Sequence, residues 1–527
     1  MTTQEPSIHV APPTAHSPAH TAGDKRLSKA AVAAGGAALV SLTGFLATLT
    51  MPYGPATAAQ VWLVMASSLV VGLIGGLVLR TRWALLLLPL VYVLTVEATR
   101  LNAVGPTVDA IRLDNVFGIL ALIVGRGFHG VVALLPMLWG IGSGLTLAPF
   151  LSGAAGAPPV TPLRAIAHQP ALLLLGLLVL GLAVVNGLPA RTPPIVDDNG
   201  NPVPGSIAEL ATVRLGGHEQ AILLRGHSAD LPVLLYLSGG PGQSDLPYSR
   251  VLLADLTKDF VVVSWDQRGT GKSYAALDPA ATLTPAQAIA DTIELTNYLR
   301  ARFDEEKIYL LGESWGSTLA VLAVQQRPEL YHAVIGSGQM VSQRETDRQL
   351  YADVLALAAQ SGDTALAEQM RSFGEPPYAD TPYPNAVVMG YYSRLEQPYT
   401  PPQAYIERGM AANLGPYGIF GSEYNLVEKV NVLRGLIDMF SIMYPQLQEI
   451  DFRRDVPRLA TPVYLLDGKA ELMARRTLAL AWYAMLEAPI KRIYSFENAA
   501  HSVAFEQYEA LQQIFRETIL PETYPTR

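Results

Sequence analysis

Cysteine is absent from this chain of 527 residues, and its absence removes several kinds of chemistry. Without thiols the chain forms no disulfide, offers no thiolate nucleophile and has no cysteine-ligated metal site. The absence of cysteine does not indicate in which cellular compartment the protein lies. A chain of this length corresponds to several domains, because a typical domain has about 150 residues.

Charged residues are scarce in the first 190 positions. This part carries nine Lys and Arg against five Asp and Glu, a net charge of +4, whereas the remainder carries 28 against 40, a net charge of −12. Hydrophobic residues make up 50% of the whole chain, and its mean hydropathy is +0.25. These values are too apolar for a typical soluble enzyme, and the cause is local. We therefore predict a membrane domain over 29–190.

Five apolar stretches approach or reach the roughly 20 residues that a bilayer core requires. The predicted transmembrane spans are 30–50, 61–79, 83–99, 130–151 and 171–188. Each alone could be a buried core helix, but five in succession favour a membrane domain. The first is longer than the apolar part of a signal peptide, about 7–15 residues, so we predict a signal anchor. Residues 1–28 before it are predicted to be a disordered cytoplasmic tail.

Basic residues predict the orientation of these spans. They lie before the first span, between the second and third, and between the fourth and fifth: Lys25, Arg26, Lys29, Arg80, Arg82 and Arg164. Positive residues mark the cytoplasmic side, so five crossings place the C-terminal domain outside the plasma membrane. The stretch 117–124 is too short to cross, and we expect an interfacial or re-entrant segment. As a sixth span it would leave the enzyme in the cytoplasm.

Ionisable residues are missing from the interiors of the predicted spans. Such residues mark transport pathways and proton relays in membranes, so we expect the spans to anchor the enzyme, or to shape the approach of an apolar substrate. The spans are instead rich in small residues that suit close helix packing. These are Gly35, Gly36, Gly72, Gly75, Gly76, Gly140, Gly142 and Gly144.

The sequence Gly-Glu-Ser-Trp-Gly at 312–316 matches the pattern of a nucleophile elbow. A strand-like run, 307–311, precedes it and a helix-like run, 317–323, follows it. Strand, sharp turn and helix is the context in which this pattern exposes a serine hydroxyl above a sheet. We therefore predict that Ser314 is a catalytic nucleophile.

Two later strand-like runs supply partners for Ser314. One leads into Asp467 and Glu471, and the next leads to His501. Serine, then acid, then histidine is the chain order of an α/β-hydrolase triad. His501 would accept the serine proton, while the acid would hold the imidazole tautomer and stabilise the imidazolium. We favour Glu471 as the acid, with Asp467 as the alternative.

A glycine-rich loop, Ser-Gly-Gly-Pro-Gly at 238–242, follows another buried strand-like run. Backbone N–H groups in such a loop can bind a developing oxyanion together with the N–H that follows the nucleophile. We predict an oxyanion hole at Gly240 and Trp315.

A third motif, Trp-Asp-Gln-Arg-Gly-Thr-Gly-Lys-Ser, occupies 265–273, and its last three residues resemble the end of a phosphate-binding loop. That loop requires glycine five residues before Gly271, and Asp266 stands there instead. We therefore exclude nucleotide binding. No motif implies a metal, an organic cofactor or a nucleic-acid partner.

The motifs GGPG, DQRGxGxS and GxSWGS, in this order, resemble the proline iminopeptidase-type branch of the α/β hydrolases, which includes prolyl aminopeptidases and tripeptidyl-type exopeptidases. The resemblance covers about three-fifths of the chain, from Ser206 onward. It implies an α/β-hydrolase fold with a helical cap, Ser314 as nucleophile, His501 as base and Glu471 at the acid position.

The resemblance also implies an oxyanion hole at Gly240 and Trp315, and this chain departs from the family pattern at two positions. The family usually has histidine before GGPG and aspartate as the acid, where Ser238 and Glu471 stand here. Its iminopeptidases hold the substrate amine with acidic residues of the cap, and we find no matching motif in this cap.

The boundaries of the C-terminal part follow from changes in pattern. Residues 191–205 are rich in Pro, Asp and Asn and are predicted to be a linker. The hydrolase domain is predicted over 206–527, with a hairpin around Gly216. Helical spacing replaces the strand and helix alternation over 341–455, which predicts a cap above the site. The expected fold is thus α/β, preceded by an all-α transmembrane domain of about five helices.

The combined prediction is a membrane-anchored serine hydrolase that releases N-terminal residues from short peptides outside the cytoplasm. One alternative is an esterase or lipase-like acyl hydrolase, because both reactions use the same catalytic groups. A second is a non-catalytic binding or transport component that uses the hydrolase fold to bind. The predicted triad argues against the second alternative.

Overall fold

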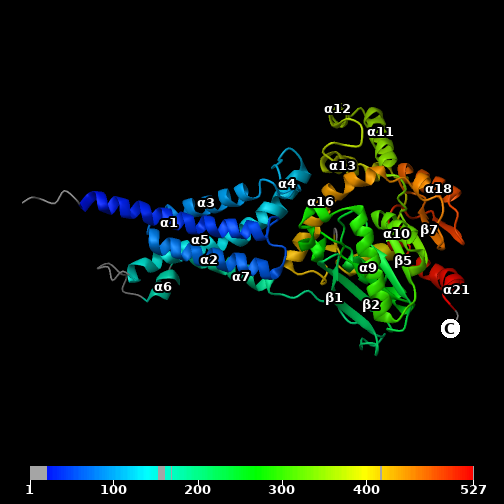
Figure 1. The fold of residues 1–527 in the computed structure, drawn as a ribbon, viewed down its shortest axis with the longest axis horizontal. Coiled ribbons are helices and arrows are strands. Elements are labelled where there is room, and N and C mark those ends of the chain that lie inside the picture. Colours follow the sequence, from blue (N-terminus) through cyan, green and yellow to red (C-terminus); the bar gives the residue numbers. More distant parts are fainter. Residues whose placement is uncertain (1–20, 152–160, 168, 416–417, 526–527) are drawn as a thin grey trace, which may run out of the picture.

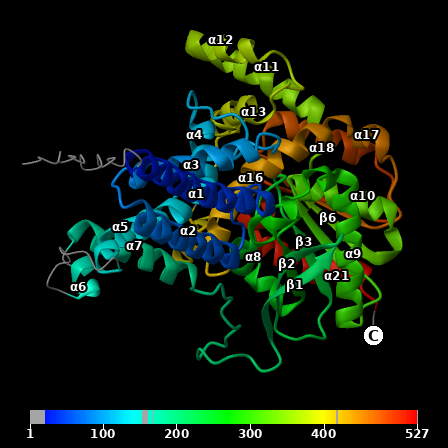
Figure 2. The same cartoon turned by 60° about the vertical axis from the view of Figure 1, so that its left-hand side comes forward.

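The computed structural model describes residues 21–151, 161–167, 169–415 and 418–525. Figures 1 and 2 show an elongated bundle of N-terminal helices beside a region built on a twisted sheet. Helix α16 (Leu426–Met443) lies where the two regions meet. The molecule therefore consists of a helical bundle and a sheet-based region that share one boundary.

The bundle consists of apolar helices that run side by side (Figure 1). They are α1 (Thr21–Thr50), α2 (Ala58–Leu79), α3 (Ala84–Thr99), α4 (Val116–Leu122), the π-helix η1 (Ile123–Gly127), α5 (Phe128–Leu151), α6 (Pro162–Ala167) and α7 (Pro170–Asn186). Three helical stretches are long and apolar enough to cross a membrane: Ala30–Thr50, Ala58–Leu79 and Val116–Leu151. The apolar helices Ala84–Thr99 and Pro170–Asn186 are shorter. The bundle is thus suited to membrane association.

Helix α1 begins earlier than the predicted end of the tail at residue 28. Residues 1–20 of that tail lie outside the described residues, and the helix starts at Thr21. Alanine, lysine and arginine dominate 24–34 and are strong helix formers, so the helix extends beyond the apolar part of the chain.

The stretch 117–124, for which the sequence analysis expected a separate interfacial or re-entrant segment, is helical and continuous with α5. Asn115 caps α4 by accepting the N–H of Gly118 at 2.7 Å, and the helix continues through η1 into α5. The continuous helix Val116–Leu151 has 36 residues and is about 54 Å long at 1.5 Å per residue. It exceeds the roughly 30 Å hydrocarbon core of a bilayer, so one end can extend beyond the membrane.

Helices α2 and α5 pack backbone against backbone. A Cβ added at Gly72 or Gly76 would overlap a backbone carbonyl oxygen of α5, and one added at Gly140 or Gly144 would overlap one of α2. Both glycine pairs have the GxxxG spacing of close helix contacts in membranes. At these four positions the predicted use of small residues for helix packing is confirmed.

The sheet has eight strands in the order β1-β2-β4-β3-β5-β6-β7-β8. They are β1 (Ile207–Leu215), β2 (His218–Gly226), β3 (Val233–Leu237), β4 (Val261–Trp265), β5 (Ile308–Glu313), β6 (Tyr331–Ser337), β7 (Val463–Gly468) and β8 (Lys491–Phe496). The first two form the predicted antiparallel hairpin, and β3 to β8 are parallel. This arrangement confirms the predicted α/β-hydrolase fold.

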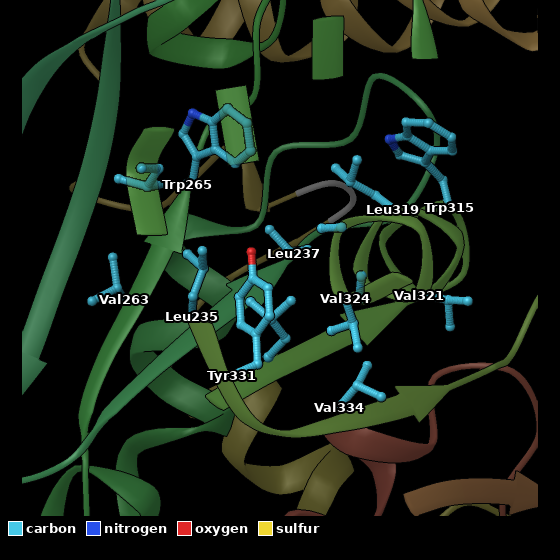
Figure 3. Close-up of a cluster of buried hydrophobic side chains, with 14 of the residues drawn as sticks. Leu235, Leu237, Val263, Trp265, Trp315, Leu319, Val321, Val324, Tyr331 and Val334 are labelled. Atoms are coloured by element: carbon cyan, nitrogen blue, oxygen red, sulfur yellow. The ribbon is translucent and has the colours of Figure 1, made fainter. Parts of the chain in front are cut away.

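Helices cover both faces of the sheet. They are α8 (Leu246–Leu252), α9 (Pro285–Phe303), α10 (Trp315–Gln326), α18 (Met473–Met485), α19 (Val503–Glu506), α20 (Tyr508–Ile514) and α21 (Leu520–Thr523), with short 3-10 and π turns between them. Leu235 of β3 packs with Leu319 of α10 on one face (Figure 3), while Tyr236 packs with Phe505 on the other. Successive strand residues alternate between the faces, so each strand supports two hydrophobic layers.

A helical cap is inserted between β6 and β7. Its helices are α11 (Gln343–Ser361), α12 (Thr364–Phe373), α13 (Pro382–Met389), α14 (Tyr392–Leu395), α15 (Gln403–Ala411), α16, the 3-10 helix η7 (Tyr444–Glu449) and α17 (Phe452–Asp455). The catalytic candidates follow the carboxyl ends of the parallel strands, which is where open α/β sheets bind ligands.

Candidate active site

Ser314 lies on a sharp turn between β5 and α10. Its backbone has φ 53° and ψ −120°, a conformation that non-glycine residues rarely adopt and that occurs at strained functional sites. Its N–H donates to the carbonyl oxygen of Ser337 at 3.0 Å. A Cβ at Gly316 would overlap the carbonyl oxygen of Leu237, so the turn packs directly on β3. The local structure is the predicted strand, turn and helix.

Glu471 and His501 meet beyond the ends of β7 and β8. Oε2 of Glu471 contacts Nδ1 of His501, and Oε1 accepts the N–H of Leu472 at 2.8 Å. Burial alone would raise the pKa of Glu471, but the charges of His501 and Arg475, together with these hydrogen bonds, lower it to about 2. The carboxylate is therefore ionised at neutral pH and holds the imidazole by one nitrogen.

Asp467, the alternative acid, has different partners. Its Oδ1 and Oδ2 accept bonds from Nε and Nη2 of Arg476 at 2.8 and 2.9 Å. Its Oδ2 also accepts the hydroxyl of Ser495 at 2.7 Å. Within the described residues no hydrogen bond joins Asp467 to His501. The structure therefore brings only Glu471, of the two candidates, to the histidine.

The end of β6 connects the Ser314 turn with the His501 loop. Besides its carbonyl bond to the N–H of Ser314, Ser337 accepts the N–H of Ala504 on Oγ at 3.0 Å. Gly338 has φ 52°, and a Cβ there would lie 2.8 Å from Nδ1 of His501. The imidazole therefore rests directly on Gly338. The sequence analysis missed this residue, for which the Gly-Ser-Gly end of the strand was the local signal.

The glycine-rich loop lies against Ser314. A Cβ at Gly239 would stand 3.2 Å from Cβ of Ser314. Gln267 joins this loop to the start of α10, because its Nε2 donates to the carbonyl of Ser238 at 3.1 Å and its Oε1 accepts Nε1 of Trp315 at 3.0 Å. The predicted oxyanion residues Gly240 and Trp315 thus belong to segments that one side chain ties together. The sequence analysis recognised the motif that contains Gln267 but not this role.

The same motif fastens the cap to the sheet. Asp266 accepts the N–H of Lys272 at 2.8 Å and the hydroxyl of Tyr424, in the cap, at 3.0 Å. Burial raises the pKa of Asp266 to about 7. Nζ of Lys272 lies 2.7 Å from Oε1 of Glu428 in α16. The lysine that resembled a phosphate ligand therefore pairs with a cap carboxylate.

Glu313, directly before Ser314, was not among the predicted site residues. It is 3% exposed, and its Oε1 accepts the hydroxyl of Ser502, the neighbour of His501, at 2.7 Å. Burial, and after it the negative charge of Asp245, raises the pKa of Glu313 to about 8. A carboxylic acid that is protonated at neutral pH therefore links the Ser314 turn to the His501 loop.

The chain matches most of the length of one relative. It is 30% identical over 302 residues to a probable aminopeptidase, YbaC, of Bacillus subtilis (strain 168), a stretch that covers 57% of this chain and 93% of the relative. The α/β hydrolase fold family matches over residues 232–378. The chain belongs to the α/β-hydrolase family.

Two further proteins are similar to this chain. The hydrolase is 34% identical over 111 residues to a proline iminopeptidase of Heyndrickxia coagulans, which covers 21% of this chain and 36% of that protein. A solved structure of a proline iminopeptidase-related protein of Thermus thermophilus covers 60% of the hydrolase and 99% of its own chain, with 20% identity and a TM-score of 0.42.

A cap carboxylate lies close to Glu471 in the candidate site of the hydrolase. The N–H of Gln397 donates to the carbonyl oxygen of Ala470 at 3.2 Å, which fixes Glu396 beside the loop that carries Glu471. Burial, and then the negative charge of Glu471, raises the pKa of Glu396, while the charge of His501 lowers it. The sequence analysis found no acidic cap residue for a substrate amine, because only tertiary contacts bring Glu396 here.

Glu506 is a second carboxylate beside the His501 loop of the hydrolase. Its Oε2 accepts the N–H of Ala500 at 3.0 Å, and its Oε1 accepts the hydroxyl of the cap residue Tyr399 at 3.2 Å. Burial is the main cause that raises its pKa. The arrangement can therefore support transfer of an acyl group from a substrate to a serine, and it can offer negative charge to a cationic substrate group.

Proposed function

We propose that this hydrolase is a membrane-anchored serine peptidase that releases N-terminal residues from short peptides. Ser314 attacks the substrate carbonyl carbon, and His501 accepts the serine proton and later donates it to the leaving amine. Glu471 stabilises the imidazolium. The contact between Glu471 and Nδ1 of His501 carries the proposal, because it leaves Nε2 as the nitrogen for Ser314.

The oxyanion of the tetrahedral intermediate is proposed to bind the N–H groups of Gly240 and Trp315. Trp315 begins α10, and the first N–H groups of a helix have no partner within it and carry partial positive charge. Gln267 ties the two segments together, so both donors can address the same oxygen. Loss of one such donor lowers kcat by about 10²–10³ in subtilisin.

The carboxylates beside His501 favour a peptide over an ester. The α-amino group of a peptide has a pKa near 8 and is an ammonium at neutral pH. We expect Glu396 and Glu506 to attract such a cation, which a neutral acyl ester lacks. The peptidase names of the relatives agree with this preference. The esterase or lipase-like alternative has no comparable support.

The proposed location of the hydrolase region is outside the plasma membrane. The hydrolase region lies at the end of the bundle where α1, α3 and α7 end (Figure 1). The segments that join α2 to α3 and α5 to α7 lie at the opposite end, and they contain Arg80, Arg82 and Arg164. Positive residues favour the cytoplasmic side. Six crossings would require a separate span near Phe117, and that segment is continuous with α5.

Ser314→Ala tests the chemistry. We expect this variant to lose turnover and fluorophosphonate labelling while wild-type expression is kept. Ser361→Ala is the matched control, because the Ser361 hydroxyl bonds only to carbonyl oxygens of its own helix among the described residues. Labelling that persists in Ser314→Ala would refute the nucleophile. A panel of aminoacyl amides and acyl esters then separates the two reactions, and faster turnover of neutral esters than of amides with a free amine would refute the peptidase.

Access in intact cells tests the location. An impermeant fluorophosphonate should label Ser314 without lysis if the region is extracytoplasmic. Labelling only after the membrane is broken would place the enzyme in the cytoplasm.

A further inference from the structure

Helix α16 belongs to the cap, yet it lies against the membrane bundle as well as the catalytic loops (Figure 1). Three of the side chains directed to the bundle are polar and fully buried: Asn431, Arg434 and Asp438 are each 0% exposed. Buried charges are costly unless their partners are well placed. The partners of these residues therefore define where α16 can lie.

Arg434 binds backbone carbonyls from two separate parts of the bundle. Its Nε donates to the carbonyl of Val124 in the π-helix η1 at 2.8 Å, and its Nη1 donates to the carbonyl of Pro55 between α1 and α2 at 2.8 Å. Nδ2 of Asn431 donates to the next carbonyl, that of Ala56, at 2.7 Å. The guanidinium thus joins two bundle segments to one turn of α16.

Asp438, about one turn further along, binds the connection between α3 and α4. Its Oδ1 accepts the N–H of Thr107 at 3.1 Å, and its Oδ2 accepts the hydroxyl of Thr107 at 2.6 Å. The same Oδ2 accepts the hydroxyl of Tyr274, from the sheet-based region, at 2.7 Å. One carboxylate therefore joins the bundle, the cap and the sheet-based region.

Another face of α16 touches the catalytic loops directly. A Cβ at Gly435 would lie 2.9 Å from Cα of Thr270, and a Cβ at Gly242 would lie 2.6 Å from the carbonyl oxygen of Gly435. Gly242 ends the loop that contains Gly240, and Thr270 belongs to the motif of Gln267. Backbone contacts of this kind leave no side chain to absorb a shift, so movement of α16 would be passed to the loop.

We propose that the membrane bundle positions the oxyanion loop of the hydrolase through α16, with Thr107, Arg434 and Asp438 as positioning residues. The bundle is then part of the active-site framework in addition to an anchor. The proposal rests on the proposed role of Ser314 and Gly240. A displacement of about 1 Å far from the reacting atoms can lower a rate by about 10², so a small shift of α16 is sufficient.

Thr107→Val in the full-length protein tests the proposal, because it removes one hydroxyl of the bundle and keeps the side-chain shape. We expect kcat on an aminoacyl amide, and the rate constant of fluorophosphonate labelling, to fall about tenfold while KM changes less than twofold. Thr107→Ser keeps the hydroxyl and should restore both values. Thr43→Val is the matched control, since the Thr43 hydroxyl bonds only to the Leu39 carbonyl within α1 among the described residues.

Tyr274→Phe removes the other hydroxyl from the same carboxylate oxygen. Combined with Thr107→Val, it should show less than the product of the two single effects, because both act through Asp438. A Thr107→Val protein that is less heat-stable but has wild-type kcat would overturn the positioning role, and so would equal losses in Thr107→Ser and Thr107→Val. A wild-type protein that no fluorophosphonate labels would refute the proposed function instead.

Discussion

The N-terminal helical bundle and the hydrolase region hold their elements together in opposite ways. Helices α2 and α5 meet at positions without side chains, where an added methyl would strike backbone. In the hydrolase, large buried side chains such as Trp315 and Trp482 fill the space between sheet and helices. In water, burial of apolar surface drives packing, whereas lipid is as apolar as the helices, and close contact must supply the stabilisation.

The two regions also differ in buried charge. Ionisable residues of the bundle, such as Glu97 near the end of α3 and Arg126 in η1, pair with each other at 3.1 Å. The hydrolase buries Glu313, Asp266 and Glu471 next to its catalytic loops. A change of charge should therefore lower catalysis when it is made in the hydrolase region. Removal of side-chain volume should destabilise the hydrolase core, whereas addition of side-chain volume should destabilise the bundle.

The largest expected effect is on catalysis. Glu471→Gln should lower kcat by about 10⁴, because the imidazole loses control of its tautomer, while the unfolding temperature changes little. Asp467→Asn is the matched variant and should keep kcat within a few fold, since Asp467 pairs with Arg476. The measurement is kcat on an aminoacyl amide in detergent. A crippled Asp467→Asn beside a mild Glu471→Gln would reverse the assignment.

Removal of volume from the hydrolase core should come next. Leu319 is 0% exposed in the layer shown in Figure 3, and Leu319→Ala should lower the free energy of unfolding by about 2–5 kcal/mol through lost burial and a cavity. Denaturant unfolding followed by tryptophan fluorescence measures this. The half-exposed Leu322 of the same helix provides the control, and an equal loss in Leu322→Ala would contradict the argument from burial.

Addition of volume to the bundle should have a smaller but similar cost. Gly76→Ala places a methyl against the Ile141 carbonyl and should destabilise the α2 and α5 pair by about 1–3 kcal/mol, as overpacking does. Gly181→Ala adds the same methyl to α7, where nothing lies within 4 Å. Thermal aggregation in detergent should occur earlier for the first variant alone. Equal aggregation temperatures of the two variants would contradict the argument that α2 and α5 pack through positions without side chains.

The smallest effect concerns pH. The pKa of Glu313 is raised from 4.5 to about 8, so between these values the folded state holds a proton that the unfolded state has lost. The contribution of Glu313 to the free energy of unfolding therefore falls as pH rises. Glutamine at this position cannot titrate, and Asp245, Glu506 and Glu471 remain as charged neighbours.

The unfolding temperature of Glu313→Gln relative to wild type should accordingly increase by several degrees from pH 5 to pH 8. Ser502→Ala provides a control, because it removes the hydrogen bond to Glu313 but leaves the carboxyl. A temperature difference that stays constant over this pH range would show that Glu313 takes up no proton on folding.

Local patterns were enough to predict the elements that carry the site. Ser314 stands in a strand, turn and helix context that short-range sequence defines, and the structure has that context. The order of the later strands predicted that Glu471 and His501 lie near each other, and the two side chains are in contact. The sequence could not predict that Asp467 lies away from His501. This depends on the pairing of Asp467 with Arg476 and on the direction in which the chain leaves β7.

Contacts between distant segments account for what the sequence analysis missed. Gln267 and Glu396 acquire their partners only when loops from different strands and from the cap converge. The extent of the fourth bundle helix was missed for another reason: the apolar run 117–124 is too short by itself to cross a membrane, but the π-helix η1 joins it to α5. Hydropathy alone identified the apolar core of each span but not its ends.

The bonds of Arg434 also impose an order on biosynthesis. They join residues that are 310 and 379 positions apart, and Pro55 and Val124 leave the ribosome long before α16 does. Pairing of such distant residues is slow, and domains generally fold as units from the N-terminus during synthesis. The bundle should therefore fold first, with these carbonyls solvated, and the cap helix should later dock on a bundle that is already in place.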